Sequence, residues 1–325
     1  MRNMEPVVSP LTETYLKEAD RICRLSFGTF LGLPDPMSFF GDADYVFTRF
    51  KTNPSLSLGA YMDGEIVGSN FVAIWGSVGI FGPLTVRPDL WDKGIGKHLL
   101  ERTMEIFRQH NVKHIGFLTF ANSAKHIHFY QKYDFWPRFL TSVMSKPITP
   151  RNSTSNVEVT SNFFRYSSFD ESSRSDIIKE SISLTDSIYR GLNLGSEVQS
   201  VFQQTLGDTI LMRDKDMSLC GLAVCHCGAG TEAGSNTCYV KFGATISNGQ
   251  QSALDLFENL LNSCEHFAAS QGLSKLVAGV NVGNLDAYRK MITKGFRTEF
   301  QGVLMTKNND PGYHREDICV IDDWR

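Results

Sequence analysis

The chain has 325 residues, a net charge of -3 at pH 7, and 42% hydrophobic and 21% charged residues. This length suggests about two domains, and the composition is that of globular proteins. A slightly negative chain without a basic run argues against nucleic acid as an obligatory partner. There is no apolar stretch of membrane-spanning length and no signal-peptide core, and the seven cysteines lack CxxC pairs, which fits a reducing compartment. We therefore expect a cytoplasmic protein without a membrane partner.

The first predicted elements are a helix and a β-hairpin. After a starting strand at 7–8, apolar residues at helical spacing predict a helix and its connection over 12–33. An aromatic-rich segment broken by prolines follows. Two alternating apolar runs joined by Asp63-Gly64, a strong turn signal, then predict an antiparallel hairpin over 57–73.

The stretch over 82–107 predicts a strand, a glycine loop and a helix in succession. The strand covers 83–86 and ends before Pro88, which cannot donate to a β-ladder. The loop contains Gly-Ile-Gly at 94–96. The apolar residues after it fall at helical spacing and are Leu100, Met104 and Phe107. A helix that begins in such a loop offers unpaired N–H groups and a partial positive charge to a diphosphate; the alternative is a tight turn without a ligand.

The spacing in this stretch resembles the acyl-CoA pyrophosphate loop of the GNAT acetyltransferases. That family has V-x-P, a short gap, and then Arg or Gln-x-x-Gly-x-Gly or Ala; here V-R-P at 86–88 precedes WDKGIG. Trp91 stands at the Arg or Gln position, so one side-chain contact of the family pattern is missing. Since the loop binds mainly through backbone N–H groups, the site is retained, and Lys93 or Lys97 can supply the charge.

A second motif supports the resemblance. A buried strand is predicted over 114–120, and a short helix follows it. GNAT enzymes commonly carry Asn-x-x-Ala-x-x-x-Tyr-x-Lys-x-Gly-Phe at this place. Tyr130, Lys132 and Phe135 match the end of that pattern, with Asp134 in place of Gly. Two motifs in the family order are a more specific signal than either alone.

The start of the second motif matches less well. Ser123 falls where the family has Asn, and Asn122 lies one residue earlier; either suits a helix N-cap. His126 takes the Ala position, which the resemblance puts near the thiol arm of the cofactor. His126 and His128 are two residues apart on the predicted helix and face different sides, so they are poor joint metal ligands.

The resemblance implies direct transfer of an acetyl group from acetyl-CoA, as co-substrate, to a primary amine in a ternary complex. A backbone N–H of the strand over 84–86 would stabilise the oxyanion, and Tyr130 would be the general acid that gives a proton to the CoA thiolate. The structural alternative for Tyr130 is a packed aromatic ring. No general base is visible, so a water is the expected route. The expected cofactor contacts are Leu84, Thr85, Val86, Trp91, Asp92, Lys93, Gly94, Ile95, Gly96, Lys97, Asn122, Ser123 and His126.

The acceptor pocket is less defined by the sequence. In the GNAT fold it is lined by the region between the first two strands, which here contains Asp35, Asp42 and Asp44. These carboxylates either attract an ammonium group or act as caps and turn residues. The resemblance implies a small-molecule or peptide amine as acceptor.

The order of elements recurs in the second half of the chain, with matching strand and helix ends about 160 residues later. The corresponding loop over 247–251 lacks Gly-x-Gly, and Met291 stands at the general-acid position. We therefore predict a degenerate second copy. Four cysteines and a histidine gather around its hairpin, namely Cys220, Cys225, His226, Cys227 and Cys238. Zinc is one reading of this cluster, but without CxxC knuckles buried thiols are favoured and no metal is expected.

These observations predict a mixed α/β (α+β) protein of two tandem GNAT-like domains, each with a mixed, mostly antiparallel sheet flanked by helices. The N-terminal acetyltransferase domain would cover 1–146, a linker 147–162, the degenerate domain 163–309 and a tail 310–325. The tail either adds a strand or covers a groove, or else is a frayed end. The sequence leaves the oligomeric state open. One option is a monomer in which the two domains pair as the subunits of a dimer would. The rival functions are a non-catalytic acyl-CoA-binding scaffold, and a transferase with another acyl donor or a thiol or hydroxyl acceptor.

Overall fold

A computed structural model of the chain describes residues 5–149 and 162–325, so most of the expected linker lies outside the described residues. The helices of the described residues are α1 (Leu16–Phe30), α2 (Val46–Thr52), α3 (Ile95–Gln109), α4 (Ala124–Gln131), α5 (Glu171–Ile188), α6 (Gly195–Gln203), α7 (Ala253–Ser270) and α8 (Leu285–Thr293). The strands of the first half are β1 (Val7–Pro10), β2 (Ser57–Met62), β3 (Glu65–Trp75), β4 (Val78–Phe81), β5 (Thr85–Val86), β6 (His114–Phe120) and β7 (Phe135–Pro147). Those of the second half are β8 (Phe163–Arg165), β9 (Gly207–Arg213), β10 (Leu219–Gly228), β11 (Gly234–Ile246), β12 (Lys275–Asn281), β13 (Arg297–Lys307) and β14 (Ile318–Ile321).

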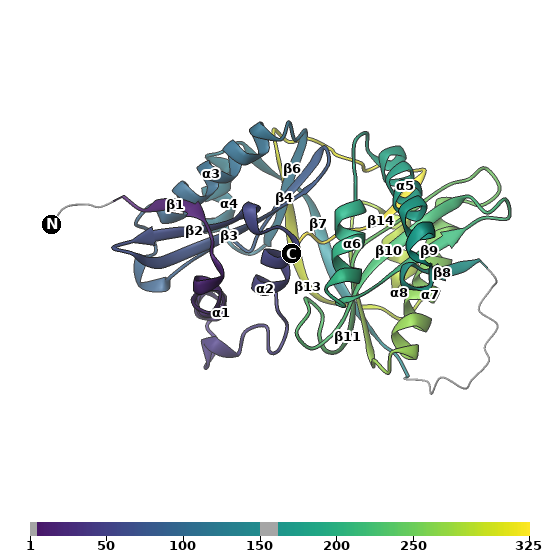
Figure 1. Ribbon diagram of the computed structural model, residues 1–325, viewed down its shortest axis with the longest axis horizontal. Coiled ribbons are helices and arrows are strands. Elements are labelled where there is room, and N and C mark those ends of the chain that lie inside the picture. The colour runs from purple at the N-terminus through teal and green to yellow at the C-terminus, as the bar shows by residue number, and fades with distance from the viewer. Residues whose placement is uncertain (1–4, 150–161) are drawn as a thin grey trace.

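The strands join in one sheet that runs through both halves of the molecule (Figure 1). Its order is β1-β2-β3-β4-β6-β13-β7-β12-β11-β10-β9-β8, while β5 pairs with β3 and β14 pairs with β11. Most neighbours are antiparallel; the parallel pairs are β4 with β6 in the first half and β11 with β12 in the second. The two halves therefore repeat the same strand arrangement on either side of the centre, and the predicted fold class is confirmed.

The centre of the sheet is built by strands that the two halves exchange. β13, from the second half, lies between β6 and β7 of the first half. β7 in turn pairs with β12 of the second half, from Lys275 opposite Pro147 to Asn281 opposite Thr141. Because each of these strands has neighbours from the other half, the two halves form one hydrogen-bonded body.

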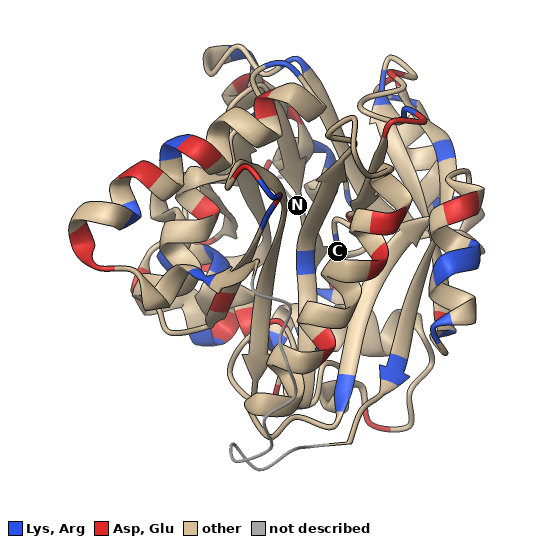
Figure 2. Cartoon of the chain, turned by 90° about the vertical axis from the view of Figure 1, so that its right-hand side faces the viewer, with Lys and Arg blue, Asp and Glu red and all other residues tan. Residues whose placement is uncertain are grey.

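Helices cover both faces of the sheet in each half (Figure 1). Successive residues of β3 alternate between the faces: Ile66 packs with α1 and α2, and Val67 packs with α3. β10 alternates in the same way, since Val224 belongs to the core under α5 and α6 and Cys225 to the core under α7. In Figure 2, Lys and Arg are interspersed with Asp and Glu along the helices. Among the described helices, none combines the length and apolarity needed to cross a bilayer.

The local predictions agree closely with these elements. The hairpin turn at Asp63-Gly64 joins β2 to β3, and the strand predicted over 114–120 is β6. The predicted strand over 83–86 is wrong in part, because only the last two residues form β5. Gly82 has a φ of +137° and Pro83 has no N–H to donate, so the ladder is interrupted between β4 and β5.

The tail runs back into the middle of the molecule. β14 pairs with β11, from Ile321 opposite Gly243 to Ile318 opposite Ile246. Trp324, near the chain end, is buried against Gly116 of β6. The tail thus contacts both halves.

Candidate functional site

The candidate site begins where β4 and β6 part. Their parallel pairing covers three residue pairs and ends at Ile80 opposite Gly116. Beyond that point, β5 continues along β3, while β6 continues along β13 as far as Phe120. One edge of the chain between Phe81 and Val86 is therefore left without a strand neighbour among the described residues. The amide of Leu84, on this free stretch, donates to no described residue.

The glycine loop places a row of free amides beside this opening. α3 begins after Gly94, whose φ of +81° suits glycine, and no side chain caps the helix. The backbone amides of residues 92–96 donate to no residue that the structure describes. The first turn of α3 contains no acidic residue. Successive free N–H groups at an uncapped helix N-terminus are suited to an anion such as a diphosphate.

Trp91 closes the loop against the strand rather than reaching outward. Its indole N–H donates to the carbonyl of Val86 at 2.7 Å, and the hydroxyl of Ser26 donates to the same oxygen at 2.8 Å. This explains how the loop is held without the Arg or Gln of the family pattern. The side chain of Trp91 stabilises the loop conformation through this hydrogen bond. Its contact with the cofactor stays a prediction.

The charges around the loop are partly balanced by α4. Asp92 pairs with Lys125 of α4 at 2.8 Å, and Lys125 also lies 5.7 Å from the centre of the Trp91 ring. Lys93 is exposed, and Lys97 lies 3.8 Å from Glu101. The Asp92–Lys125 pair reduces the repulsion that the Asp92 carboxylate would exert on a phosphate.

Tyr130 lies in an aromatic cluster at the base of the opening. Its ring centre is 4.1 Å from that of Phe117 on β6 and 6.1 Å from that of Phe81 on β4, the two strands that diverge. Tyr130 is 8% exposed, and burial raises its pKa above the ordinary value. Its hydroxyl has no hydrogen-bond partner among the described residues, so it is available to a ligand. Phe129 links this cluster to the loop, because a Cβ built on Gly96 would lie 3.7 Å from the Phe129 ring.

The start of the second motif forms a local cap. Ser123 is the N-cap of α4, and its Oγ accepts from the amide of His126 at 3.3 Å and lies 2.9 Å from the His126 Nδ1. Burial lowers the pKa of His126, and its ring centre is 4.7 Å from that of Phe30. A neutral imidazole at this place is suited to hydrogen bonding. Asn122 is exposed beside the cap.

The three aspartates of the expected acceptor region have structural partners. Asp35 accepts from the amide of Met37 at 3.1 Å, and Asp44 accepts from that of Phe47 at 2.9 Å, as capping residues do. Asp42 accepts from the amide of Ser235 in the second half at 2.8 Å. Capping therefore describes Asp35 and Asp44, while Asp42 joins the first half to the second.

A buried ionic cluster between the halves has no counterpart in the sequence predictions. Arg49 of α2 pairs with Glu232 at 2.9 Å, and Lys241 of β11 bridges Glu232 at 3.0 Å and Glu197 of α6 at 2.8 Å. The Trp75 indole donates to Glu197 at 3.2 Å. The cluster borders a cavity of about 40 Å³, about the size of one water, that reaches Phe81 and the other residues at the end of β4. No local sequence pattern reports such contacts, because the partners are far apart in the chain.

The cysteines of the second half are core residues. Cys225, Cys238 and Cys264 are buried in the core under α7, and all seven cysteines are free thiols. Among the described residues, no group of three or more histidine, cysteine or acidic side chains converges as metal ligands.

Comparisons with known proteins agree with the resemblance that the glycine loop and the Tyr130 motif carry in the sequence. Residues 23–135 match the family model "Acetyltransferase (GNAT) family". A presumed acetyltransferase from Pyrococcus horikoshii has a TM-score of 0.65 and 12% identity, with 97% of this chain and 92% of that chain covered. A GCN5-related N-acetyltransferase from Sphaerobacter thermophilus has a TM-score of 0.57 and 13% identity, with 96% and 98% covered.

A tandem GNAT protein from the clavulanic acid biosynthesis pathway is similar over 94% of this chain and 99% of that chain, with a TM-score of 0.58 and 13% identity. No curated protein sequence matches the chain. At these identities the structural likeness concerns the fold. Residues 23–135 thus match the GNAT acetyltransferase family, and the chain as a whole has the tandem GNAT fold.

Proposed function

We propose that the chain is an N-acetyltransferase that moves the acetyl group of acetyl-CoA to a primary amine by direct transfer in a ternary complex, with its active site in the N-terminal half. The observation that carries this proposal is the free edge between Phe81 and Val86, which runs into the free amides of residues 92–96. The reducing interior suggested by seven free thiols supports a cytoplasmic location.

The residues of the opening fit the two ends of the cofactor. A pantetheine arm can lie along the free edge of β5 as an extra strand would lie, and the amides of 92–96 can hold the pyrophosphate. Gly96 is helical and has no Cβ to cover those amides. Lys93 and Lys97 add positive charge at the rim of the loop.

Tyr130 is proposed as the group that protonates the leaving thiolate. Bound acetyl-CoA supplies an acetyl group activated as a thioester. The backbone N–H of Leu84 is the candidate donor to the negative charge that develops on the carbonyl oxygen when the amine nitrogen attacks. The C=O bond re-forms as the C–S bond breaks and the thiolate leaves. Because burial raises the pKa of Tyr130, its hydroxyl stays protonated at neutral pH and can donate to sulfur.

The proton of the amine is proposed to leave through water. The carboxylate of Glu197 lines the small cavity next to Phe81, but Lys241 and the Trp75 indole already hold its two oxygens. Among the described residues, no other carboxylate lines that cavity. We therefore expect kcat/KM to rise with pH until the acceptor amine is itself deprotonated.

The test is acetyl-CoA binding by calorimetry with the variant Gly96→Glu. A glutamate is compatible with the helical backbone here, and its Cβ would point toward Leu84, Val86 and Phe129 at the opening without a clash. The added negative charge beside the free amides then repels a diphosphate. We expect binding by the parent and at least about a hundredfold loss in the variant. The control Gln251→Glu adds the same charge to the exposed loop before α7 and leaves affinity unchanged. A folded parent that does not bind acetyl-CoA would remove the proposal.

Two other functions are separated by assays of the same protein. A non-catalytic acyl-CoA-binding scaffold would bind the cofactor at this loop and show no turnover on any amine in a panel of small amines and peptides. A transferase with another donor or with a thiol or hydroxyl acceptor would be active only when the donor or acceptor is changed. The free Leu84 amide and the available Tyr130 hydroxyl favour catalysis over binding alone.

A further inference from the structure

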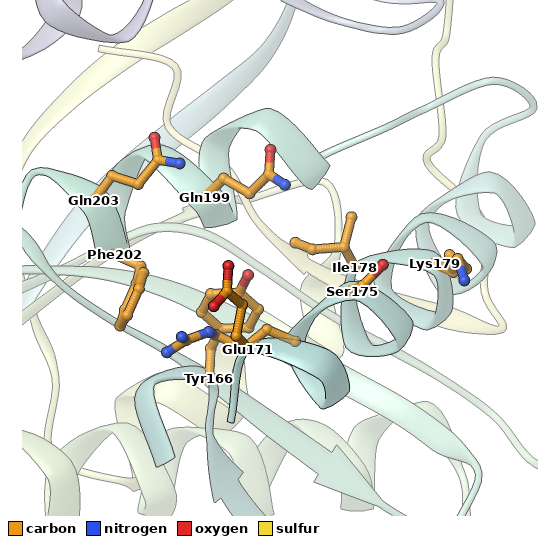
Figure 3. Close-up of a pocket in the computed structure, with 9 residues that line it drawn as sticks. Tyr166, Glu171, Ser175, Ile178, Lys179, Gln199, Phe202 and Gln203 are labelled. Carbon is orange, nitrogen blue, oxygen red and sulfur yellow. The ribbon is translucent and has the colours of Figure 1, made fainter. Parts of the chain in front are cut away.

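A groove between α5 and α6 of the second half lies apart from the elements of the acyl-CoA site. Its volume is about 380 Å³, within the range of small-molecule pockets. The residues that line it are Tyr166, Glu171, Arg174, Ser175, Ile178, Lys179, Gln199, Phe202 and Gln203. In Figure 3 the Glu171 carboxyl projects between Phe202 of α6 and Ile178 of α5. The groove thus combines two apolar walls with charged groups of both signs.

Two opposite charges of the groove form no ion pair among the described residues, although hydrogen bonds from Ser173 and Ser172, and then the charge of Arg174, lower the pKa of the nearby Asp170. Glu171 and Arg174 are three residues apart on α5, where opposite charges commonly pair, yet they form no ion pair. Three other pairs at this spacing do pair, namely Glu18 with Arg21, Arg102 with Glu105, and Asp176 with Lys179. Arg174 instead stacks on the ring of Phe202, with its guanidinium carbon 4.4 Å from the ring centre. Among the described residues, neither the Arg174 guanidinium nor the Glu171 carboxylate has a hydrogen-bond or ion-pair partner.

The other polar groups of the groove are also available. The Tyr166 ring is 4% exposed, but its hydroxyl has no hydrogen-bond partner in the described part of the chain. The same holds for the side-chain amides of Gln199 and Gln203 on α6. The N-terminus of α5 does not provide this site, since the Asp170 side chain caps it by accepting from Ser173. Glu171, Gln199 and Gln203 are exposed, Arg174 is half-buried and Tyr166 is buried, so the groove presents unpaired donors and acceptors to a ligand.

The geometry points to a site for a free amino acid with an apolar side chain. Arg174 presents several N–H donors to a carboxylate, held in place by its stack on Phe202. Glu171, one helical turn away on α5, is placed to accept from the ammonium group. Ile178 and Phe202 offer apolar surface to the side chain, and the two glutamine amides can complete the hydrogen bonds. A zwitterion satisfies both free charges, which a simple anion or cation does not.

The test is a binding titration of the full chain, without acetyl-CoA, by calorimetry or NMR. The probes are L-phenylalanine and L-leucine, with 3-phenylpropionate and phenethylamine as analogues that lack the ammonium or the carboxylate group. We expect the amino acids to bind at least about tenfold more tightly than either analogue, because each lost group removes a charge-assisted hydrogen bond. Equal binding of 3-phenylpropionate would reduce the site to an anion site, and no binding at millimolar amino acid would overturn the proposal.

Variants locate the binding. Arg174→Gln and Glu171→Gln are each expected to weaken amino acid binding about tenfold or more, while Arg174→Lys retains part of the affinity through its charge. Asp286→Asn and Arg289→Gln are matched controls, since these exposed residues of α8 have the same spacing and are also unpaired. Circular dichroism checks that each variant is folded. Binding that persists unchanged in both groove variants would place the amino acid elsewhere, for example in the acceptor pocket of the first half, and would contradict this site.

Discussion

The two halves of the molecule differ at the place where their parallel strands part. In the first half, β4 and β6 separate after Ile80 and no described strand occupies the edge that becomes free. In the second half, β11 and β12 separate after Val240, and β14 pairs with β11 from Gly243 onward. Because β10 already occupies the other edge of β11, β14 lies on the edge that β12 leaves. The second half therefore fills with its own tail the position that the first half leaves open.

The helices next to these openings differ in the same direction. α3 has no side-chain cap, and five successive amides at and before its start are free. Before α7, the Asn248 side chain accepts from the amides of Gln250 and Gln251. Ser252 is the N-cap of α7, and its hydroxyl accepts from the amide of Asp255. Asp255 also puts a carboxylate in the first turn. Thus the amides before the helix are free in the first half and are satisfied internally in the second.

The comparison assigns different tasks to equivalent elements. The first half keeps the open edge and the free amides, which the proposed reaction needs. The second half gives up both, and instead contributes β13, the tail and an ion cluster that complete the first half. The predictions below test this division.

The largest effect is expected at the general-acid position. Tyr130→Phe should lower kcat by roughly 10²–10⁴-fold with acetyl-CoA affinity nearly unchanged, because only the hydroxyl that protonates sulfur is lost. The counterpart in the second half, Met291, is buried in a core, and Met291→Leu should leave turnover unchanged. Steady-state kinetics and calorimetry measure both. Equal rates for Tyr130→Phe and the parent would show that the Tyr130 hydroxyl is not a general acid, and that Tyr130 is a packed ring as Met291 is a packed side chain.

The pH profile gives a second measure of Tyr130. Its raised pKa means that the proton is present throughout the neutral and mildly alkaline range. The rate of the parent should therefore show no alkaline decline from this group up to about pH 10, the ordinary value for tyrosine. A decline of kcat near pH 8 that disappears in Tyr130→Phe would contradict the buried environment described above.

The ion cluster tests how far the first half depends on the second. Burial by itself raises the pKa of Glu232, but the charges of Arg49 and Lys241 outweigh it and hold the pKa well below the ordinary value. Glu232→Gln should lower the free energy of unfolding by about 3–5 kcal/mol, because two buried cations lose their shared partner. Glu299→Gln, which breaks a half-exposed pair with Lys275, should lower it by about 1 kcal/mol or less. Chemical denaturation measures both.

The effect of Glu232 also has a defined pH dependence. A lowered carboxyl pKa contributes stability that is present above the unfolded value, about 4.3, and is lost as the pH falls toward the folded value. The difference in unfolding free energy between the parent and Glu232→Gln should therefore be constant near neutral pH and decrease below about pH 4. A difference that grows on acidification would show that Glu232 is not held as a carboxylate by its two cations.

The sequence predicted what local patterns determine. The hairpin turn at Asp63-Gly64, the glycine loop and the position of Tyr130 on a short helix all follow from spacing and turn chemistry. The exchange of β7 and β13, the pairing of β14 with β11 and the contact of Arg49 with Glu232 join residues that are far apart in the chain. Such contacts depend on tertiary packing, which periodicity within one segment does not report. The lack of Gly-x-Gly at 247–251 predicted a degenerate second copy, but not that the tail forms a strand beside β11.

The smallest effect is expected from the exposed cation of the loop. The Lys97 side chain is 54% exposed and lies 3.8 Å from Glu101, so water screens its interaction with a bound phosphate. Lys97→Gln should weaken acetyl-CoA binding only about two- to fivefold, and the difference should shrink as salt is added. Lys215→Gln, in the exposed hairpin turn of the second half, should have no effect. A loss of a hundredfold in Lys97→Gln would mean that this side chain, and not the row of free amides, distinguishes the first loop from the second.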